Sequence, residues 1–110
     1  MIKGIGSDIV KVERVKEKLE KKLLTGQEEY KNQEHFAGLW AAKEAILKAM
    51  GCGISAISFK DIEIYCDEFG APKVKLNEKA QMKLNDMDGD RVHITISHEK
   101  EYAIAFAVIE

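Results

Sequence analysis

Residues 40–48 read Trp-Ala-Ala-Lys-Glu-Ala-Ile-Leu-Lys, and on a helix they place a charge where an apolar side chain is expected. The 3.6-residue period predicts a helix over 34–50 with one broad apolar stripe. Lys43 lies in the middle of that stripe, and Glu44 and Lys48 stand at its edge, four residues apart. The stripe consists of Phe36, Leu39, Trp40, Ala42, Ile46, Leu47, Ala49 and Met50.

A charged head within an apolar stripe must reach water, a partner or a ligand. For Lys43 the alternatives are a stem that packs while the ammonium reaches water, or an ammonium that binds a ligand. For Glu44 and Lys48 they are an ordinary surface ion pair, contributing about 0.3–0.5 kcal/mol, or a functional pair. This helix alone leaves both questions open.

Two further motifs flank the helix. Residues 4–8 read Gly-Ile-Gly-Ser-Asp, and residues 93–98 read His-Ile-Thr-Ile-Ser-His. In this order the three motifs resemble the 4′-phosphopantetheinyl transferases, and among them the short bacterial holo-acyl-carrier-protein synthases. The resemblance extends from Gly4 to about Val108 and includes the turn at Gly70 and Pro72.

Composition indicates an ordinary globular chain. With 110 residues, 45% of them hydrophobic and 33% charged, one domain with a single core is expected. A net charge of −2 gives no reason to expect nucleic acid as a partner. No apolar run predicts a membrane span or a secretion signal. Cys52 and Cys66 are interpreted as two reduced, partly buried thiols, which favours the cytoplasm.

The pattern along the chain predicts an α+β fold in one domain, 1–110, with an antiparallel sheet packed on the long helix. Asp8 stands where it could cap a helix over 9–24, and Asn77 could cap the helix over 78–84. The final strand is apolar on both faces, so we expect a helix on one side and a neighbouring subunit on the other. The other expected elements are strands over 1–7, 61–66, 73–76, 91–97 and 102–109, and a short helical turn over 27–32.

Asp8 and Glu44 are the candidate metal ligands. For Asp8 the alternative is a pure helix N-cap, although the glycines before it would allow close approach to a ligand and a helix N-terminus favours phosphate. Two carboxylates suit a Mg²⁺ ion that completes its shell with water and phosphate oxygens. The resemblance implies that both residues bind the metal, and it implies Mg²⁺ as the cofactor.

The resemblance also implies the coenzyme A site. Lys48 matches a lysine at the diphosphate, where it and Glu44 are the candidate catalytic residues. Ser97 and His98 match residues that contact the coenzyme from an adjacent subunit. The predicted coenzyme-binding residues are Lys43, Lys48, Gly51, Gly70, Pro72, Ser97 and His98.

A basic stripe on the predicted first helix suggests a second substrate. Lys11, Arg14, Lys18 and Lys21 recur at spacings of three and four, and Lys22 lies beside them. A solvated charged face is the ordinary explanation. A local positive patch also suits an acidic macromolecule, and in the family an acidic acyl carrier protein binds here. We therefore predict carrier contacts at Arg14, Lys18, Lys21 and Lys22.

Together these features predict transfer of 4′-phosphopantetheine from coenzyme A to a serine of an apo acyl carrier protein, with release of adenosine 3′,5′-bisphosphate. The general base is left open between Glu44 and a metal-bound water. The resemblance further implies a homotrimer with active sites between subunits. Short members commonly carry arginines where this chain has Glu34 and Leu39. The alternatives are a non-catalytic coenzyme A-binding module and a small oligomeric scaffold.

Overall fold

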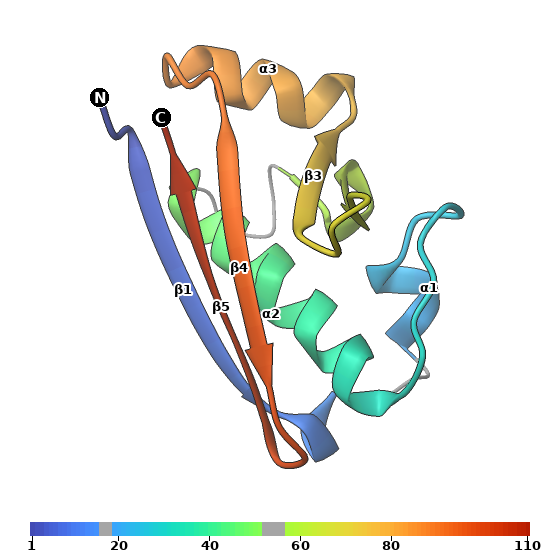
Figure 1. Ribbon diagram of the computed structural model, residues 1–110. Helices are drawn as coiled ribbons and strands as arrows, with labels where there is room; N and C mark the ends of the chain where they lie inside the picture. The colour runs from blue at the N-terminus through green and yellow to red at the C-terminus, as the bar shows by residue number, and fades with distance from the viewer. Residues whose placement is uncertain (16–18, 52–56) are drawn as a thin grey trace.

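The computed structural model describes residues 1–15, 19–51 and 57–110, and it packs one long helix against a three-stranded antiparallel sheet (Figure 1). The sheet has the order β1-β5-β4, and a separate hairpin pairs β2 with β3. The predicted α+β fold is confirmed. The main elements are β1 (Gly4–Lys11), α2 (Gln33–Ala49), β2 (Ile62–Cys66), β3 (Pro72–Leu76), α3 (Glu78–Asp86), β4 (Val92–His98) and β5 (Tyr102–Ile109).

Helix α2 forms the centre of the molecule. The Asn32 side chain caps it by accepting a hydrogen bond from the His35 amide at 2.9 Å. At the other end Gly51 adopts a φ of +68°, the left-handed conformation that glycine tolerates, and its amide donates to the Lys48 carbonyl at 3.0 Å. The sheet covers one side of the helix, and the β2–β3 hairpin lies on the other (Figure 1).

The last strand has two apolar faces, as expected. Its inner residues Ala103, Ala105, Ala107 and Ile109 are buried. On the opposite face of the sheet, Ile5 is 71% exposed, Ile9 64% and Phe106 51%. We call this second face, with Tyr102, the outer sheet face. The prediction of a covering helix is confirmed, whereas a covering subunit remains a prediction.

The predicted first helix is wrong. β1 continues to Lys11, because every residue from Gly4 pairs with β5 and alternate side chains face α2. Two short turns follow, η1 (Val12–Arg14) and α1 (Glu20–Leu23). The apolar spacing that predicted a helix instead gives each turn its own buried contacts, at Val12, Val15 and Leu23. Asp8 is therefore a mid-strand residue and not an N-cap.

Two smaller expectations also fail. No helical turn forms over 27–32, where the chain runs as a loop toward α2. Cys66 is an exposed free thiol and is not partly buried, while Cys52 falls outside the described residues. Among the helices that the structure describes, none is both long and apolar enough to cross a membrane.

Glycines set how closely β1 approaches α2. A Cβ added to Gly6 would lie 2.0 Å from the Ala45 carbonyl oxygen and 2.7 Å from the Ala49 nitrogen. A Cβ added to Gly4 would lie 2.0 Å from the Ala49 carbonyl oxygen. These atoms belong to the helix backbone and cannot move aside as a flexible side chain could. The glycines thus permit the close helix–strand contact, whereas the ligand approach that the sequence suggested stays a prediction.

We expect Gly6→Ala to lower the free energy of unfolding by about 2 kcal/mol or more, because the added methyl group would push β1 away from α2. Urea unfolding followed by circular dichroism measures the change. Gly26→Ala is the matched control, since an added Cβ there meets nothing within 4 Å. Equal stabilities for the two variants would contradict the close-approach argument.

Candidate active site

The strand and the helix bring Asp8 and Lys48 into contact. Asp8 faces α2 from the middle of β1. The Lys48 ammonium lies 3.2 Å from Asp8 Oδ1 and donates to the Ser7 carbonyl at 2.9 Å. The Asp8 side chain is 16% exposed and that of Lys48 54%. A partly enclosed carboxylate thus stands beside an accessible cation.

Glu44 is the third member of this cluster. Its partial burial raises the pKa of the Glu44 carboxyl, the negative charge of Asp8 raises it further, and the charges of Lys48 and Lys22 oppose the rise. The two carboxylates are therefore close enough to repel each other, and the two lysines offset part of the rise in the Glu44 pKa.

This arrangement fits Mg²⁺. Hard carboxylate oxygens are the ligands that Mg²⁺ prefers, and the ion commonly uses one or two of them together with water and substrate phosphate. Within the described ranges, no three His, Cys, Asp or Glu side chains gather into a complete metal site. Asp8 and Glu44 could thus hold the ion only with oxygen atoms supplied by water or a bound phosphate.

A shallow cavity of about 440 Å³ opens beside Lys48. Its walls are mostly apolar, and Lys48 is their charged member. The lining residues are Ile5, Gly6, Ser7, Lys48, Phe106, Ala107 and Val108. Because the cavity includes part of the outer sheet face, it joins the cationic site to the exposed apolar surface.

Lys43 does not line a ligand site. It is 0% exposed, and its ammonium donates to Glu28 Oε1 at 2.6 Å, the Leu23 carbonyl at 2.7 Å and the Phe59 carbonyl at 3.1 Å. All three of its protons are used inside the protein. The predicted phosphate contact is therefore corrected, and the ammonium reaches an internal partner rather than water.

Ser97 and His98 lie on opposite faces of β4, because side chains alternate along a strand. Ser97 belongs to the outer sheet face. Both residues contribute to the lining of a hollow of about 240 Å³ at this end of β4. His98 Nδ1 lies 3.0 Å from Glu34 Oε1 on the first turn of α2. Glu34 thus faces a histidine, while Leu39 is buried in the core at 3% exposure.

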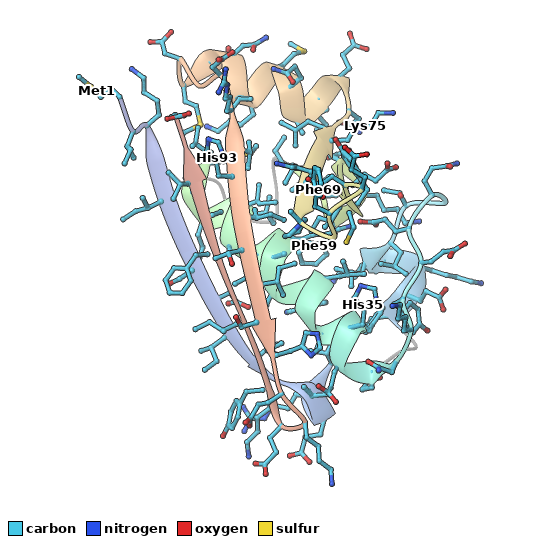
Figure 2. All side chains as sticks on the ribbon, viewed as in Figure 1. Met1, His35, Phe59, Phe69, Lys75 and His93 are labelled. Carbon is cyan, nitrogen blue, oxygen red and sulfur yellow. The ribbon has the colours of Figure 1, made fainter. Side chains whose placement is uncertain are left out.

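The remaining predicted coenzyme residues lie elsewhere. Gly51 follows Lys48 at the end of α2. Gly70, with a φ of +82°, and Pro72 belong to the β2–β3 hairpin. In this turn Asp67 Oδ1 accepts hydrogen bonds from the Phe69 and Ala71 amides at 2.9 and 3.0 Å. Phe69 is 85% exposed at the hairpin tip (Figure 2).

The predicted carrier-binding residues do not share one helix. Arg14 is on η1, and Lys21 and Lys22 are on α1. All three are exposed. Lys18 lies outside the described residues. Lys22 is near enough to Glu44 for its charge to lower the pKa of that carboxyl, so the basic surface adjoins the carboxylate cluster.

Sequence reasoning missed Glu28 and the Ser7 carbonyl. Glu28 has a side chain only 1% exposed and pairs with Lys43, but no sequence period links the two residues. The buried position of Lys43 did predict that some partner must exist. The Ser7 carbonyl is a backbone group, and no side-chain pattern could indicate it.

Comparison with known proteins places this geometry in a family. Residues 4–107 match the model of the 4′-phosphopantetheinyl transferase superfamily. The holo-[acyl-carrier-protein] synthase of Clostridium perfringens is 44% identical over 126 aligned residues, covering 100% of this chain and 95% of the relative. The chain belongs to this superfamily of transferases, as the three sequence motifs predicted.

Solved structures of holo-[acyl-carrier-protein] synthases have the same fold as this chain. The crystal structure of the holo-[acyl-carrier-protein] synthase from Neisseria meningitidis has a TM-score of 0.90 and 33% identity, covering 100% of this chain and 99% of that one. The Bacillus anthracis enzyme, solved in complex with CoA (3′,5′-ADP), has a TM-score of 0.78 and 37% identity, covering 100% and 97%.

Proposed function

We propose that this protein transfers 4′-phosphopantetheine from coenzyme A to a serine of an apo acyl carrier protein in the cytoplasm, with release of adenosine 3′,5′-bisphosphate, in support of fatty acid biosynthesis. The observation that carries the proposal is the meeting of Asp8, Glu44 and Lys48 in a chain of this superfamily. The choice of substrates follows from the names of the relatives and from the similar structure solved with CoA (3′,5′-ADP).

The chemical obstacle is electrostatic, because a serine oxygen must attack a negatively charged diphosphate. Phosphoryl-type transfers are accelerated mainly by positioning and charge stabilisation. Lys48 is exposed beside the cavity and can place its ammonium on a phosphate oxygen. Its contacts with Asp8 and the Ser7 carbonyl hold that ammonium in place before the coenzyme binds.

Asp8 and Glu44 would hold Mg²⁺. When bound, the ion would neutralise diphosphate charge and stabilise the leaving oxygen. Glu44 would also be a candidate to accept the serine proton, since burial and the charge of Asp8 raise the pKa of its carboxyl. A water next to these carboxylates is the alternative acceptor.

We expect mass spectrometry to show the gain of one phosphopantetheine on an apo acyl carrier protein incubated with the protein, coenzyme A and Mg²⁺, and EDTA to abolish the gain. Asp8→Ala or Glu44→Gln should lower the rate by on the order of a hundredfold or more, because charge on the diphosphate is then left unbalanced.

The control for this assay is Glu29→Gln, which makes the same change at an exposed position. Near-normal turnover of both site variants at saturating Mg²⁺ would refute the metal assignment. Binding of coenzyme A without transfer to any apo carrier would favour the binding-module alternative.

The basic surface next to the site is proposed to bind the acidic carrier. Arg14→Glu with Lys21→Glu should raise the KM for the carrier at least about tenfold and spare the KM for coenzyme A, because like charges would then face each other. Lys3→Glu with Lys79→Glu is the matched control, since it makes the same charge change at exposed positions outside the proposed carrier surface. An unchanged carrier KM would remove this docking proposal.

We also propose a homotrimer that covers the outer sheet face. Sedimentation velocity should give a trimer for the wild-type chain and a smaller species for Phe106→Asp, because a charge would enter an apolar contact. Met82→Asp, at a residue that is 60% exposed on α3, is the control and should leave the trimer intact. A stable and active wild-type monomer would contradict the proposal.

A further inference from the structure

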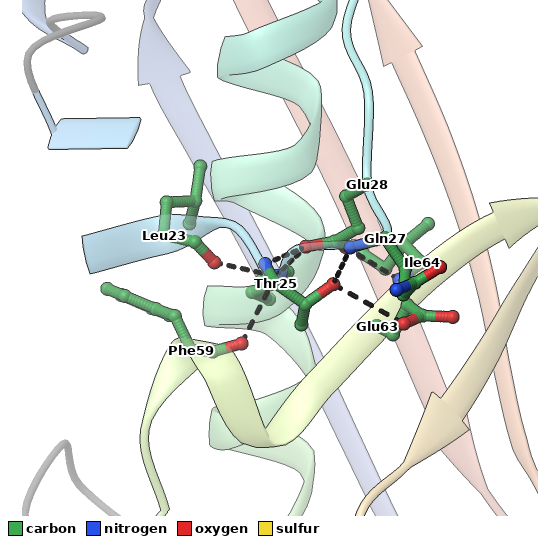
Figure 3. A network of polar contacts seen from close by, with 8 residues as sticks. Leu23, Thr25, Gln27, Glu28, Phe59, Glu63 and Ile64 are labelled. Atoms are coloured by element: carbon green, nitrogen blue, oxygen red, sulfur yellow. Dashed lines mark hydrogen bonds and ion pairs between the residues drawn. The ribbon is translucent and has the colours of Figure 1, made fainter. Parts of the chain in front are cut away.

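The Lys43–Glu28 ion pair is the most enclosed polar feature that the structure describes. The two side chains are 0% and 1% exposed, and their charged atoms lie 2.6 Å apart. Lys43 also donates to the carbonyls of Leu23 and Phe59 (Figure 3). An ammonium has three protons, so none is left for a ligand.

Glu28 is equally occupied. Its Oε1 accepts from Lys43 and from the Thr25 amide at 2.9 Å, and its Oε2 accepts from the Ile64 amide at 2.7 Å (Figure 3). We call these two side chains and their four backbone partners the Lys43–Glu28 clamp. The clamp ties together α2, the loop after α1, η3 (Phe59–Asp61) and β2.

Stability alone does not account for such a pair. Removing two charges from water is costly, and well-packed apolar residues in place of a buried ion pair often give equal or greater stability. A methionine at position 43 would also complete the apolar stripe of α2. Because stability does not explain the pair, the segments that the clamp joins indicate its role.

Three of the joined segments carry or adjoin part of the proposed active site. Lys43 directly precedes Glu44 on α2. Leu23 directly follows Lys22, whose charge acts on Glu44. Ile64 belongs to β2, the first strand of the hairpin that contains Gly70 and Pro72. One buried ion pair thus connects the proposed metal helix, the proposed carrier surface and the proposed coenzyme hairpin.

We propose that the Lys43–Glu28 clamp is a positioning device that fixes the carrier-binding and coenzyme-binding segments relative to Glu44. Lys43 and Glu28 act through the residues beside them and touch no substrate. This inference rests on the proposed transferase function.

The test is steady-state kinetics on Lys43→Met combined with Glu28→Gln, which leaves no unpaired buried charge and keeps an acceptor for the Thr25 or Ile64 amide. We expect the KM for both substrates to rise on the order of tenfold, because small displacements of substrate-positioning groups strongly affect catalysis. Lys43→Gln combined with Glu28→Gln is the second variant should the first fail to fold, because two amides can still form a hydrogen bond and no buried charge is left unpaired.

The matched control is Leu84→Ala, which loses stability in the core beneath α3 and makes no contact in the clamp. A merely structural clamp would give both variants lower melting temperatures and wild-type KM values, and that result would overturn the proposal. Higher KM values in the clamp variant alone would support it.

Amide hydrogen exchange makes the test independent of the proposed function. The amides of Leu24, Thr25 and Ile64 should exchange faster in the clamp variant while those of β5 keep their protection. Unchanged exchange at those three amides would overturn the clamp proposal. Absence of transfer by the wild-type protein would instead refute the proposed function, and the exchange result would then decide the clamp alone.

Discussion

The close contact between β1 and α2 is the constraint on which the site depends. Two residues of a strand advance about 6.6 Å, and four residues of a helix advance about 6 Å. Gly4 meets the backbone of Ala49 and Gly6 that of Ala45, so the strand and helix advance together in opposite directions. Asp8 is the next inward residue in this series. The same step would bring Asp8 opposite Ala41, one turn before Glu44, and the long side chain of Lys48 reaches the Asp8 carboxylate at 3.2 Å.

This constraint gives the site its charge balance. The strand contributes one carboxylate and the helix contributes a second, together with the ammonium of Lys48 one turn away. The raised pKa of Glu44 results from burial first and from Asp8 second, and two lysines do not cancel it. Two neighbouring carboxylates in a partly enclosed site suit a cation, and the ammonium beside them suits an anion. Both would be needed for the proposed metal-assisted attack on the diphosphate of coenzyme A.

The sequence predicted the parts of this molecule in which local pattern and tertiary environment agree. The long helix, the Asn77 cap and the last two strands follow from period, capping and alternation, and the family followed from three ordered motifs. The Asn32 cap was not predicted, because its residue fell within the expected turn over 27–32. The prediction of a first helix was wrong because the helical spacing of Val12, Val15, Leu19 and Leu23 is a coincidence. These residues belong to two separate turns that each pack on the core. Strand pairing with β5 outweighed that spacing, since it provides a partner along the whole of β1.

The candidate site was predicted in part: the sequence singled out its charged residues but not all of their partners. Asp8 was placed at the start of a helix, whereas it lies in the middle of β1. Its predicted part in metal binding does not depend on that element and stays a prediction. Lys43 was recognised as anomalous, but its partner Glu28 lies 15 residues away in a loop without a period. Long-range pairing of this kind depends on the tertiary path of the chain, which no local pattern encodes.

Strand alternation explains why the predicted site residues of one chain do not all lie on the same side of the sheet. Asp8 faces inward and is held against α2, whereas Ser97 and Phe106 face outward on the same sheet. No rotation of side chains brings Ser97 through the sheet to Asp8. The cavity beside Lys48 nevertheless opens toward the outer sheet face and is lined by Ile5 and Phe106. The proposed coenzyme contact at Ser97 and the proposed burial of the outer sheet face would thus have one cause, because both need a second surface placed over this sheet.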